Sequence, residues 1–361
     1  SNSEPSSESK SEAIFQPQWS PDNQLYFVSD RNNWWNIYRF SEGRCEAVLE
    51  IDAEFATPLW QFGMSTYDFI DAQTIGCLWT QQGTWQTGFI DIPTGQLNKV
   101  DSQYSSMHAL CCHQGSLYLV AGAAALPSEI MCIDTDNQTS VYAPATLEIN
   151  PSDLSQPESI LFPTRDGQQV HAFFYPPSHS LYRGQENELP LVIAICHGGP
   201  TTAADSGLNL KIQYWTSRGF AVVDINYRGS TGFGRTYRQA LDGQWGIHDV
   251  EDAQAAIGYL ADQHKIDPQR CLIRGGSAGG YTVLSALTFT DTFKAGASLY
   301  GIGDLETLAS DTHKFESRYM DKLVGPYPKE KALYKARSPI NHAQGLNCPV
   351  IFLQGLEDKV V

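Results

Sequence analysis

One serine of the sequence lies among glycines in a pattern that suits nucleophilic catalysis. Residues 275–279 read Gly-Gly-Ser-Ala-Gly, a G-x-S-x-G motif with Ser277 at its centre. The largely apolar run 270–274 precedes the motif, and residues 278–290 follow it with apolar side chains at helical spacing. Strand, serine and helix in this order form a nucleophile elbow, whose strained turn exposes the hydroxyl above a parallel sheet. The pattern therefore predicts Ser277 as a nucleophile.

A second glycine-rich stretch could supply the hydrogen-bond donors that such a serine needs. A serine attacks a carbonyl effectively where a base takes its proton and donors receive the charge that develops on the substrate oxygen. His197-Gly-Gly-Pro200 directly follows the apolar run 191–196, where an HGGG-type loop supplies one donor. Glycine is needed there because the substrate approaches the backbone closely. Gly198 and Gly199, together with the N–H of Ala278, are the predicted oxyanion hole. A plain turn is the alternative for the Gly-Gly-Pro.

The acid of a catalytic triad is expected near the end of the sequence. In an arrangement built on a nucleophile elbow the triad runs serine, acid, histidine along the chain. The apolar run 349–353 leads to Gly355-Leu-Glu-Asp358, and Asp358 is the predicted acid that orients and balances the imidazolium. Glu357 and Asp304 are the alternatives.

No histidine occupies the expected place of the base. The sequence has nine histidines, and none of them follows Asp358. His313 and His342 lie between Ser277 and Asp358, the wrong order for this triad, and are expected to be surface or capping residues. We therefore interpret the chain as a fragment cut at both ends, which stops before the loop of the catalytic histidine and is inactive alone.

Residues 151–361 alternate short apolar runs with amphipathic stretches. The apolar runs are expected to be strands and the amphipathic stretches helices. The expected strands are 171–175, 191–196, 220–225, 270–274, 295–300 and 349–353, and the expected helices are 207–218, 249–264 and 278–290. This alternation predicts a mostly parallel sheet with helices on both faces. Residues 151–361 are thus predicted to form an α/β-hydrolase domain that is incomplete at its C-terminus.

Residues 1–150 show a different pattern. Residues 1–12 are polar throughout and are expected to be a disordered tail or loop. Residues 13–150 consist of short β-rich runs broken by turn residues, with four runs per unit of roughly forty to fifty residues, which is β-propeller spacing. About three such units are present, and a closed propeller needs at least four. The sequence predicts a partial propeller here, with a sandwich of hairpins as the alternative.

Composition restricts the partners. The formal net charge is -16 and the pI is near 4.9, which argues against nucleic acid and anionic membranes, because both attract basic surfaces. No run approaches the ~18 consecutive apolar residues of a membrane span. The exposed strand edges of an open propeller would favour association with a second copy.

Neither a metal nor a nucleotide cofactor is indicated. The eight cysteines contain no C-x-x-C pair. Cys111-Cys112-His113 resembles a ligand cluster, but neighbouring residues on a strand point to opposite faces. The stretch 227–234 is rich in glycine yet lacks the phosphate-loop and dinucleotide patterns, so we interpret it as a turn beside the active-site mouth. Free cysteines in apolar runs favour a reducing, cytoplasmic setting.

These motifs together resemble the prolyl oligopeptidase family, and most closely its acylaminoacyl-peptidase and dipeptidyl-peptidase-like branch. The matching stretches are Trp19-Ser-Pro-Asp22, His197 to Pro200, Asn226 to Gly234, Trp245-Gly246, Asp249 to Asp252, Gly275 to Tyr281 and Gly355 to Val360. The resemblance implies a serine peptidase that hydrolyses short peptides through an acyl-enzyme on Ser277. It also implies that Tyr281, Phe315 and Tyr319 line the pocket for the residue before the scissile bond.

The sequence departs from the family at two points. Ala278 replaces an aromatic residue that is common after the nucleophile, and the triad histidine and the early propeller blades are missing. A carboxylesterase is an alternative, because acyl transfer from esters and amides uses one kind of site. A non-catalytic module that only binds peptides is the alternative from a different class.

Overall fold

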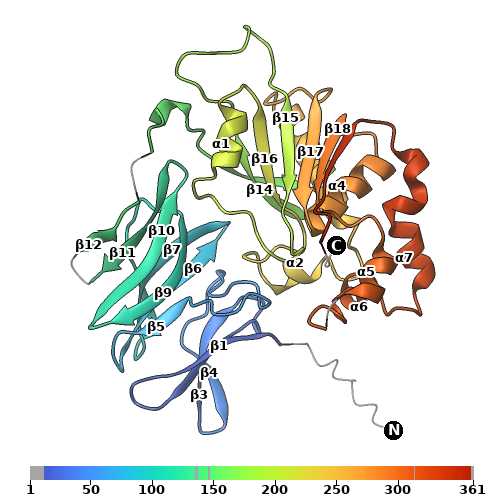
Figure 1. Ribbon diagram of the computed structural model, residues 1–361. Coiled ribbons are helices and arrows are strands. Elements are labelled where there is room, and N and C mark those ends of the chain that lie inside the picture. The colour runs from blue at the N-terminus through green and yellow to red at the C-terminus, as the bar shows by residue number, and fades with distance from the viewer. Residues whose placement is uncertain (1–11, 135–136, 145–146, 313, 359–361) are drawn as a thin grey trace.

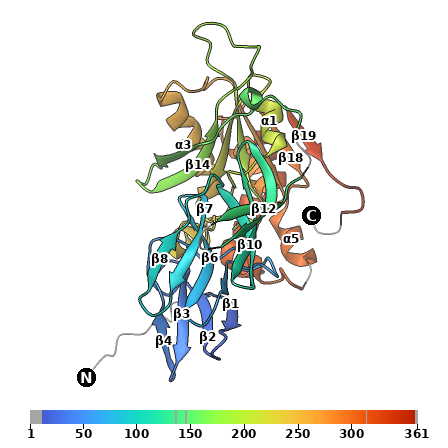
Figure 2. The same cartoon turned by 90° about the vertical axis from the view of Figure 1, so that its left-hand side faces the viewer.

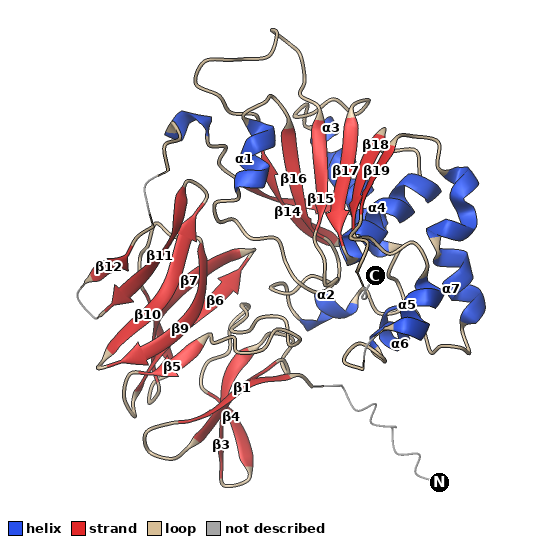
Figure 3. Cartoon of the chain, viewed as in Figure 1, coloured by secondary structure: helices blue, strands red, loops and turns tan. Residues whose placement is uncertain are grey.

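The computed structural model describes residues 12–134, 137–144, 147–312 and 314–358. Three four-stranded antiparallel sheets come first along the chain, and a seven-stranded sheet with helices follows (Figures 1 and 3). We call residues 12–144 the three-sheet part and residues 151–358 the α/β part. In Figure 1 the three-sheet part lies to the left of and below the α/β part, and in the perpendicular view of Figure 2 most of it lies below, so the two parts are adjacent units of the fold.

Each sheet of the three-sheet part is built from four consecutive strands. The first contains β1 (Ile14–Trp19), β2 (Leu25–Ser29), β3 (Asn36–Ser41) and β4 (Arg44–Ala47). The second contains β5 (Tyr67–Phe69), β6 (Thr74–Gln81), β7 (Thr84–Asp91) and β8 (Gln96–Lys99). The third contains β9 (Ser106–His113), β10 (Ser116–Ala123), β11 (Leu126–Ile133) and β12 (Gln138–Tyr142). The predicted units of four short strands are confirmed.

One hairpin in each of these sheets has the same turn chemistry. The turns Glu42-Gly43, Gln82-Gly83 and Gln114-Gly115 join β3 to β4, β6 to β7 and β9 to β10, and both residues of each turn have positive φ. Such turns match the right-handed twist of the strands, and the second position is glycine in all three. The local sequence therefore sets where these strands reverse.

The α/β part contains a sheet in the order β13-β14-β16-β15-β17-β18-β19. Its strands are β13 (Glu158–Pro163), β14 (Gln169–Tyr175), β15 (Val192–Cys196), β16 (Ala221–Asn226), β17 (Cys271–Gly276), β18 (Ala295–Leu299) and β19 (Val350–Leu353). The first two strands are antiparallel to their neighbours, and the other pairs are parallel. A mostly parallel sheet is confirmed. β13 was not predicted, because only Ile160 and Phe162 of this edge strand are buried and the strand has no continuous apolar run.

Helices and short 3₁₀ turns connect these strands. They are η1 (Pro151–Asp153), α1 (Leu210–Thr216), α2 (Arg235–Gln239), α3 (His248–Asp262), α4 (Ala278–Phe289), α5 (Leu305–Asp311), α6 (Tyr319–Leu323), α7 (Lys331–Arg337) and η2 (Pro339–Gly345). The three predicted helices are confirmed, with α1 starting later than expected because the side chain of Asn209 caps it by accepting from the N–H of Lys211.

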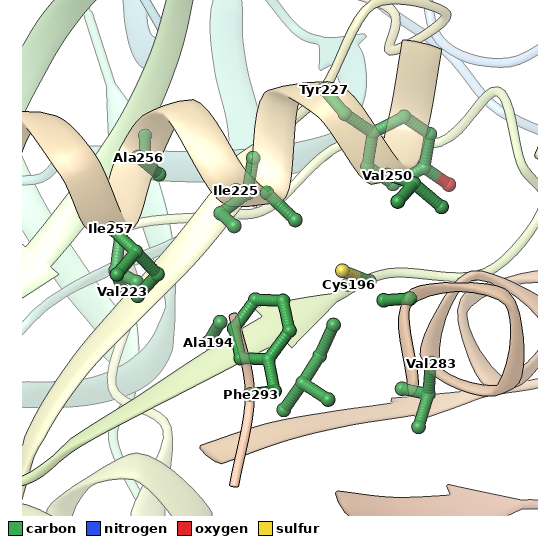
Figure 4. Close-up of a cluster of buried hydrophobic side chains, with 14 of the residues drawn as sticks. Ala194, Cys196, Val223, Ile225, Tyr227, Val250, Ala256, Ile257, Val283 and Phe293 are labelled. Carbon is green, nitrogen blue, oxygen red and sulfur yellow. The ribbon is translucent and has the colours of Figure 1, made fainter. Parts of the chain in front are cut away.

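Helices cover both faces of the sheet, as predicted. On one face, Ala172, Val223 and Ile225 pack against α3 and α4, and Figure 4 shows Val250 and Ile257 of α3 above Ala194 and Val283 in this cluster. On the other face, Phe173, Ile193 and Val222 pack against α1. Alternate residues of each strand enter different clusters because successive side chains point to opposite faces. Among the described helices, none is long and apolar enough to cross a membrane.

Candidate active site

Ser277 lies in a strained turn at the end of β17. Its backbone has φ 54° and ψ -123°, a left-handed conformation that a side chain rarely adopts. The turn is held on both sides: the N–H of Ser277 donates to the carbonyl oxygen of Leu299 at 3.0 Å, and its own carbonyl accepts from Tyr281 N at 3.1 Å. The side chain is partly exposed. The predicted strand, strained serine and helix are all present in this order.

The glycines of the motif allow α4 to begin directly against neighbouring strands. A methyl group on Gly279 would lie 2.1 Å from the carbonyl oxygen of Cys196, at the end of β15. A methyl group on Gly280 would lie 2.5 Å from the Cα of Gly301, in the loop after β18. Such contacts are far inside van der Waals distance, so only glycine permits this approach. The motif therefore brings the start of α4 to the loop after β15.

That loop carries the predicted oxyanion hole. A methyl group on Gly198 would lie 3.6 Å from the Cβ of Ser277, so the loop runs beside the serine. Gly199 has φ +112°, a conformation that requires glycine. Ala278 is the first residue of α4, so its N–H takes no part in the hydrogen bonds of the helix. The structure brings Ser277, Ala278 and Gly198 together.

His197 holds the shape of this loop. Its ring stacks on Tyr227 with centroids 4.3 Å apart, and its carbonyl oxygen accepts from the Tyr227 hydroxyl at 2.9 Å. Nδ1 lies 2.9 Å from the carbonyl oxygen of Gly198 and Nε2 lies 2.7 Å from Oγ of Ser230. Burial lowers the pKa of His197 to about 4. Since a carbonyl only accepts, Nδ1 carries the proton of the neutral ring.

Two further contacts fix the outer side of the loop. The hydroxyl of Tyr319 donates to the carbonyl oxygen of Gly199 at 2.8 Å. From the three-sheet part, Nε1 of Trp60 donates to Oγ1 of Thr201 at 3.1 Å. Tyr319 and Trp60 thus both contact the loop of the predicted oxyanion hole, and the sequence singled out only Tyr319.

An exposed aromatic pair lies between the two parts. Phe315, which the sequence predicts in the pocket, contacts Phe62 with ring centroids 5.5 Å apart in an edge arrangement. Phe62 is 80% exposed and Phe315 is 59% exposed, so apolar surface remains open here. Sequence reasoning missed Trp60 and Phe62, because their loop is remote from the motifs and its pattern carries no sign of a site.

Tyr281 is not part of this surface. Its ring is fully buried against Trp245, with centroids 4.5 Å apart, and its hydroxyl donates to the carbonyl oxygen of Arg337 at 3.0 Å. A tyrosine packed and hydrogen-bonded in this way has a core role. Tyr281 was expected to line the substrate pocket, but α4 is buried on every side from Ala278 to Leu287, so its ring packs in the core.

Asp358 lies after β19, at the same end of the parallel strands as Ser277. Its side chain is exposed, and Nε2 of Gln354 donates to its Oδ2 at 3.3 Å. The alternative Asp304 caps α5, since its side chain accepts from the N–H of Glu306 at 2.9 Å. Glu357 is exposed. Asp304 therefore has a structural role as a helix cap. Asp358 lies after the last strand, where the acid of the triad is expected.

His342 and His171 both have partners away from Ser277. His342 packs against Phe289 with ring centroids 5.2 Å apart. His313 lies outside the described residues. The ring nitrogens of His171 contact Ser159 at 2.8 Å and Asn226 at 3.0 Å.

The glycine-rich stretch 227–234 is bound by a carboxylate of the three-sheet part. The two oxygens of Glu54 accept from the N–H groups of Gly232 at 2.6 Å and Gly234 at 2.9 Å. Burial raises the pKa of Glu54 to about 7, and the nearby Arg238 opposes this shift. This stretch therefore joins the two parts beside the site. Within the described residues, no group of three or more histidines, cysteines or acids could hold a metal ion.

A family model describes most of the α/β part. Residues 206–361 match the model of the prolyl oligopeptidase family. Over these residues the chain is similar to members of the prolyl oligopeptidase family. The chain is 34% identical over 179 residues to dipeptidyl aminopeptidase BIII of Pseudoxanthomonas mexicana, a match that covers 48% of this chain and 26% of that protein. It is 29% identical over 200 residues to the acylamino-acid-releasing enzyme of Arabidopsis thaliana, which covers 52% of this chain and 25% of that protein.

The likeness to solved structures extends over nearly the whole chain. A puromycin-hydrolyzing peptidase of Mycobacterium tuberculosis superposes with a TM-score of 0.93 at 39% identity, and covers 97% of this chain and 55% of that chain. The chain thus spans about half the length of this solved structure and about a quarter of the curated relatives. The likeness includes the three-sheet part, which the family model does not reach.

Proposed function

We propose that the protein is a serine peptidase that hydrolyses short peptides through an acyl-enzyme on Ser277. The observation that carries this proposal is the strained Ser277 turn, with the loop of Gly198 and Gly199 directly beside it. A serine in this conformation presents its hydroxyl outward, and the free N–H groups of a glycine loop and a helix start suit a developing oxyanion. The names of the relatives, which are peptidases of acylated and free peptides, support the same class of reaction.

The reaction would proceed in two acyl-transfer steps. Oγ of Ser277 attacks the peptide carbonyl while a histidine takes its proton, and the carbonyl oxygen becomes negative. The N–H of Ala278 and the loop of Gly198 and Gly199 stabilise that oxygen. The histidine then protonates the leaving amine, and water hydrolyses the ester on Ser277 by the reverse sequence. Asp358 would orient the histidine and balance its charge.

We propose that this histidine comes from outside the 361 residues. Both ring nitrogens of His197 lie against the loop and Ser230, and His342 packs on Phe289. Neither ring is therefore available to take a proton from Ser277. The solved relative is about twice as long as the part this chain matches, which leaves room for such a residue.

We propose that Phe315 and Tyr319, together with Trp60 and Phe62, form the surface that accepts the substrate. Tyr319 and Trp60 bind the loop of Gly199 and Thr201 directly, and the two phenylalanines expose apolar rings nearby. The three-sheet part would restrict entry to peptides.

All eight cysteines are free thiols, which supports a reducing, cytoplasmic setting.

The test is labelling by a fluorophosphonate, which reacts only with an activated serine. We expect the longest native form of the protein to label, the 361-residue chain to label far less, and Ser277→Ala to abolish labelling in both. No labelling of the long form would refute the proposal and favour a module that only binds peptides.

A second comparison separates the peptidase from a carboxylesterase. The long form should hydrolyse puromycin or a peptide anilide, because the solved relative is a puromycin-hydrolyzing peptidase. Hydrolysis of a simple aryl ester with no cleavage of either amide would favour the esterase.

A further inference from the structure

A cavity lies between the three-sheet part and the α/β part. It has a volume of about 520 Å³. Its walls include Ser106 and Ser128 of the third sheet, the acids Asp205 and Asp224, and the apolar side chains of Ile195 and Leu208. Ser277 and the glycines of the oxyanion loop are not among its lining residues. The cavity therefore does not include Ser277, although His197 of the oxyanion loop forms part of its wall.

A buried carboxylate without a partner faces this cavity. Asp224, on β16, is only 8% exposed. Among the described residues it accepts no hydrogen bond and has no cationic group within ion-pair distance. A carboxylate this largely removed from water is costly unless a donor or a cation reaches it, and for Asp224 the cavity is the open side from which one can do so. A group with positive charge and hydrogen-bond donors would remove that cost.

The surroundings of Asp224 are acidic and polar. The charge of Asp205 acts on Asp224, and Arg274 is the one cation whose charge opposes it. The side chain of Asp205 is exposed and accepts from the N–H of Gly207 at 2.6 Å, which leaves its second oxygen for a ligand. Burial raises the pKa of the Tyr175 hydroxyl, and the charges of Asp224 and Asp205 raise it further. That hydroxyl is buried without a partner.

The remaining charged and titratable groups of the cavity do not cancel this negative charge. Lys211 lines the cavity, but its residue is exposed at the start of α1. His197 also lines it and is neutral, because burial lowers its pKa to about 4. Two carboxylates thus share one cavity with a single exposed ammonium.

We propose that this cavity binds a protonated primary amine, which Asp224 and Asp205 hold between them. An ammonium group has three donors, which suit one oxygen of each carboxylate and a hydroxyl of Ser106 or Ser128. Ile195 and Leu208 offer apolar contact for the carbon chain of the amine. The described residues offer no set of three or more metal-binding side chains, so a divalent ion is poorly suited to this site.

Protonation of Asp224 gives the binding a definite pH dependence. Burial and the charge of Asp205 raise the pKa of Asp224 to about 7, against the attraction of Arg274. At neutral pH a bound cation would therefore displace a proton from this carboxyl. The affinity for the amine should rise as the pH increases from 6 to 8, since the carboxylate form becomes more abundant.

Titration calorimetry of the full native protein with n-butylamine hydrochloride tests the proposal. We expect binding accompanied by proton release, and a loss of affinity of about tenfold or more in Asp224→Asn. Asp205→Asn should lose affinity as well, and because this residue is exposed, the variant tests the site even if Asp224→Asn does not fold. The exposed Asp291→Asn is the matched control and should bind as the wild type does.

Further arms of the experiment identify the source of the amine. Ser277→Ala should bind n-butylamine unchanged, which separates this site from the proposed peptidase site. In that variant, binding of Ala-Ala-Ala but not of its N-acetyl form would indicate a peptide amino terminus, and binding of putrescine alone would indicate a free amine. Unchanged affinity in Asp224→Asn, or binding of potassium without binding of any amine, would overturn the proposal.

Discussion

Replacing Glu54 with glutamine tests how the two parts of the chain are held together. Glu54 belongs to the loop between β4 and β5 and has no exposed surface. Each of its oxygens accepts one backbone N–H of the stretch 227–234, from Gly232 at 2.6 Å and from Gly234 at 2.9 Å. Glutamine has the same shape but no charge, so the change isolates the ionisation of the carboxyl.

Two effects on Glu54 oppose each other. Burial disfavours the charged form, whereas the two N–H groups and Arg238, whose Nη1 lies 3.9 Å from Oε1, favour it. Burial is the larger effect and raises the pKa of Glu54 to about 7 from its ordinary value of 4.5. Arg238 also pairs with Asp30 at 2.6 Å, so its charge is shared between two acids.

The sign of the effect on stability follows from this shift. Between the two pKa values the folded state keeps a proton that the unfolded state has lost, so the free energy of unfolding falls as the pH rises. For a pKa of about 7 in the folded state, the free energy of unfolding of the wild type should fall by about 2.5 kcal/mol between pH 5 and pH 8, relative to that of Glu54→Gln. Any constant cost of the lost hydrogen bond cancels in this comparison.

Urea denaturation at pH 5, 6, 7 and 8 measures the difference. As the pH rises, we expect the free energy of unfolding of the wild type to fall steadily relative to that of Glu54→Gln. The control Glu148→Gln, at an exposed position, should follow the wild type. A gap that stays constant with pH, or that changes in favour of the wild type, would refute the reasoning. It would mean that Arg238 and the N–H groups outweigh the burial of the carboxyl.

Two further predictions follow from the glycines and from His197. Gly279→Ala should destabilise the protein by about 3 kcal/mol and abolish fluorophosphonate labelling of the long form, because the new methyl group meets the carbonyl oxygen of Cys196. The control is Gly258→Ala in α3, where a new methyl group meets no other atom, and it should stabilise the protein by about 1 kcal/mol in thermal and urea unfolding. Equal changes in stability for the two variants would contradict the steric argument. Since burial lowers the pKa of His197 to about 4, the unfolded state takes up a proton in acid that the folded state does not. Between pH 6.5 and 5 the free energy of unfolding of the wild type should therefore fall by about 1.6 kcal/mol relative to that of His197→Gln in urea titrations. A parallel decline of the two proteins would show that the ring is protonated when folded.

Much of the fold could be predicted because its signals are local. The strand and helix on either side of Ser277 differ in hydrophobic period, and the motif between them requires small residues. The strained φ of Ser277 and the close approach of Gly279 to β15 follow from that pattern. The four-strand units were predictable for the same reason, since two-residue turns that contain glycine separate short β runs.

Short helices escaped prediction for a related reason. The helices α2, α5, α6 and α7 have five to seven residues, less than two full turns. A stretch of this length does not establish a period. Tyr281 was expected in the substrate pocket, and it lies in the core instead. Its helix, α4, is buried on every side, so the sequence shows no polar face from which the exposed residues could be inferred.

The sequence by itself determined the conformation of the serine turn, because that conformation depends on residues within a few positions of Ser277. Only the tertiary structure decided what surrounds the turn. Trp60 reaches Thr201 across 141 residues, and Glu54 reaches Gly232 across 178. The cavity that Asp224 faces likewise takes its walls from both parts. Such contacts depend on the relative position of distant segments, and hydrophobic period and turn chemistry describe only neighbours along the chain.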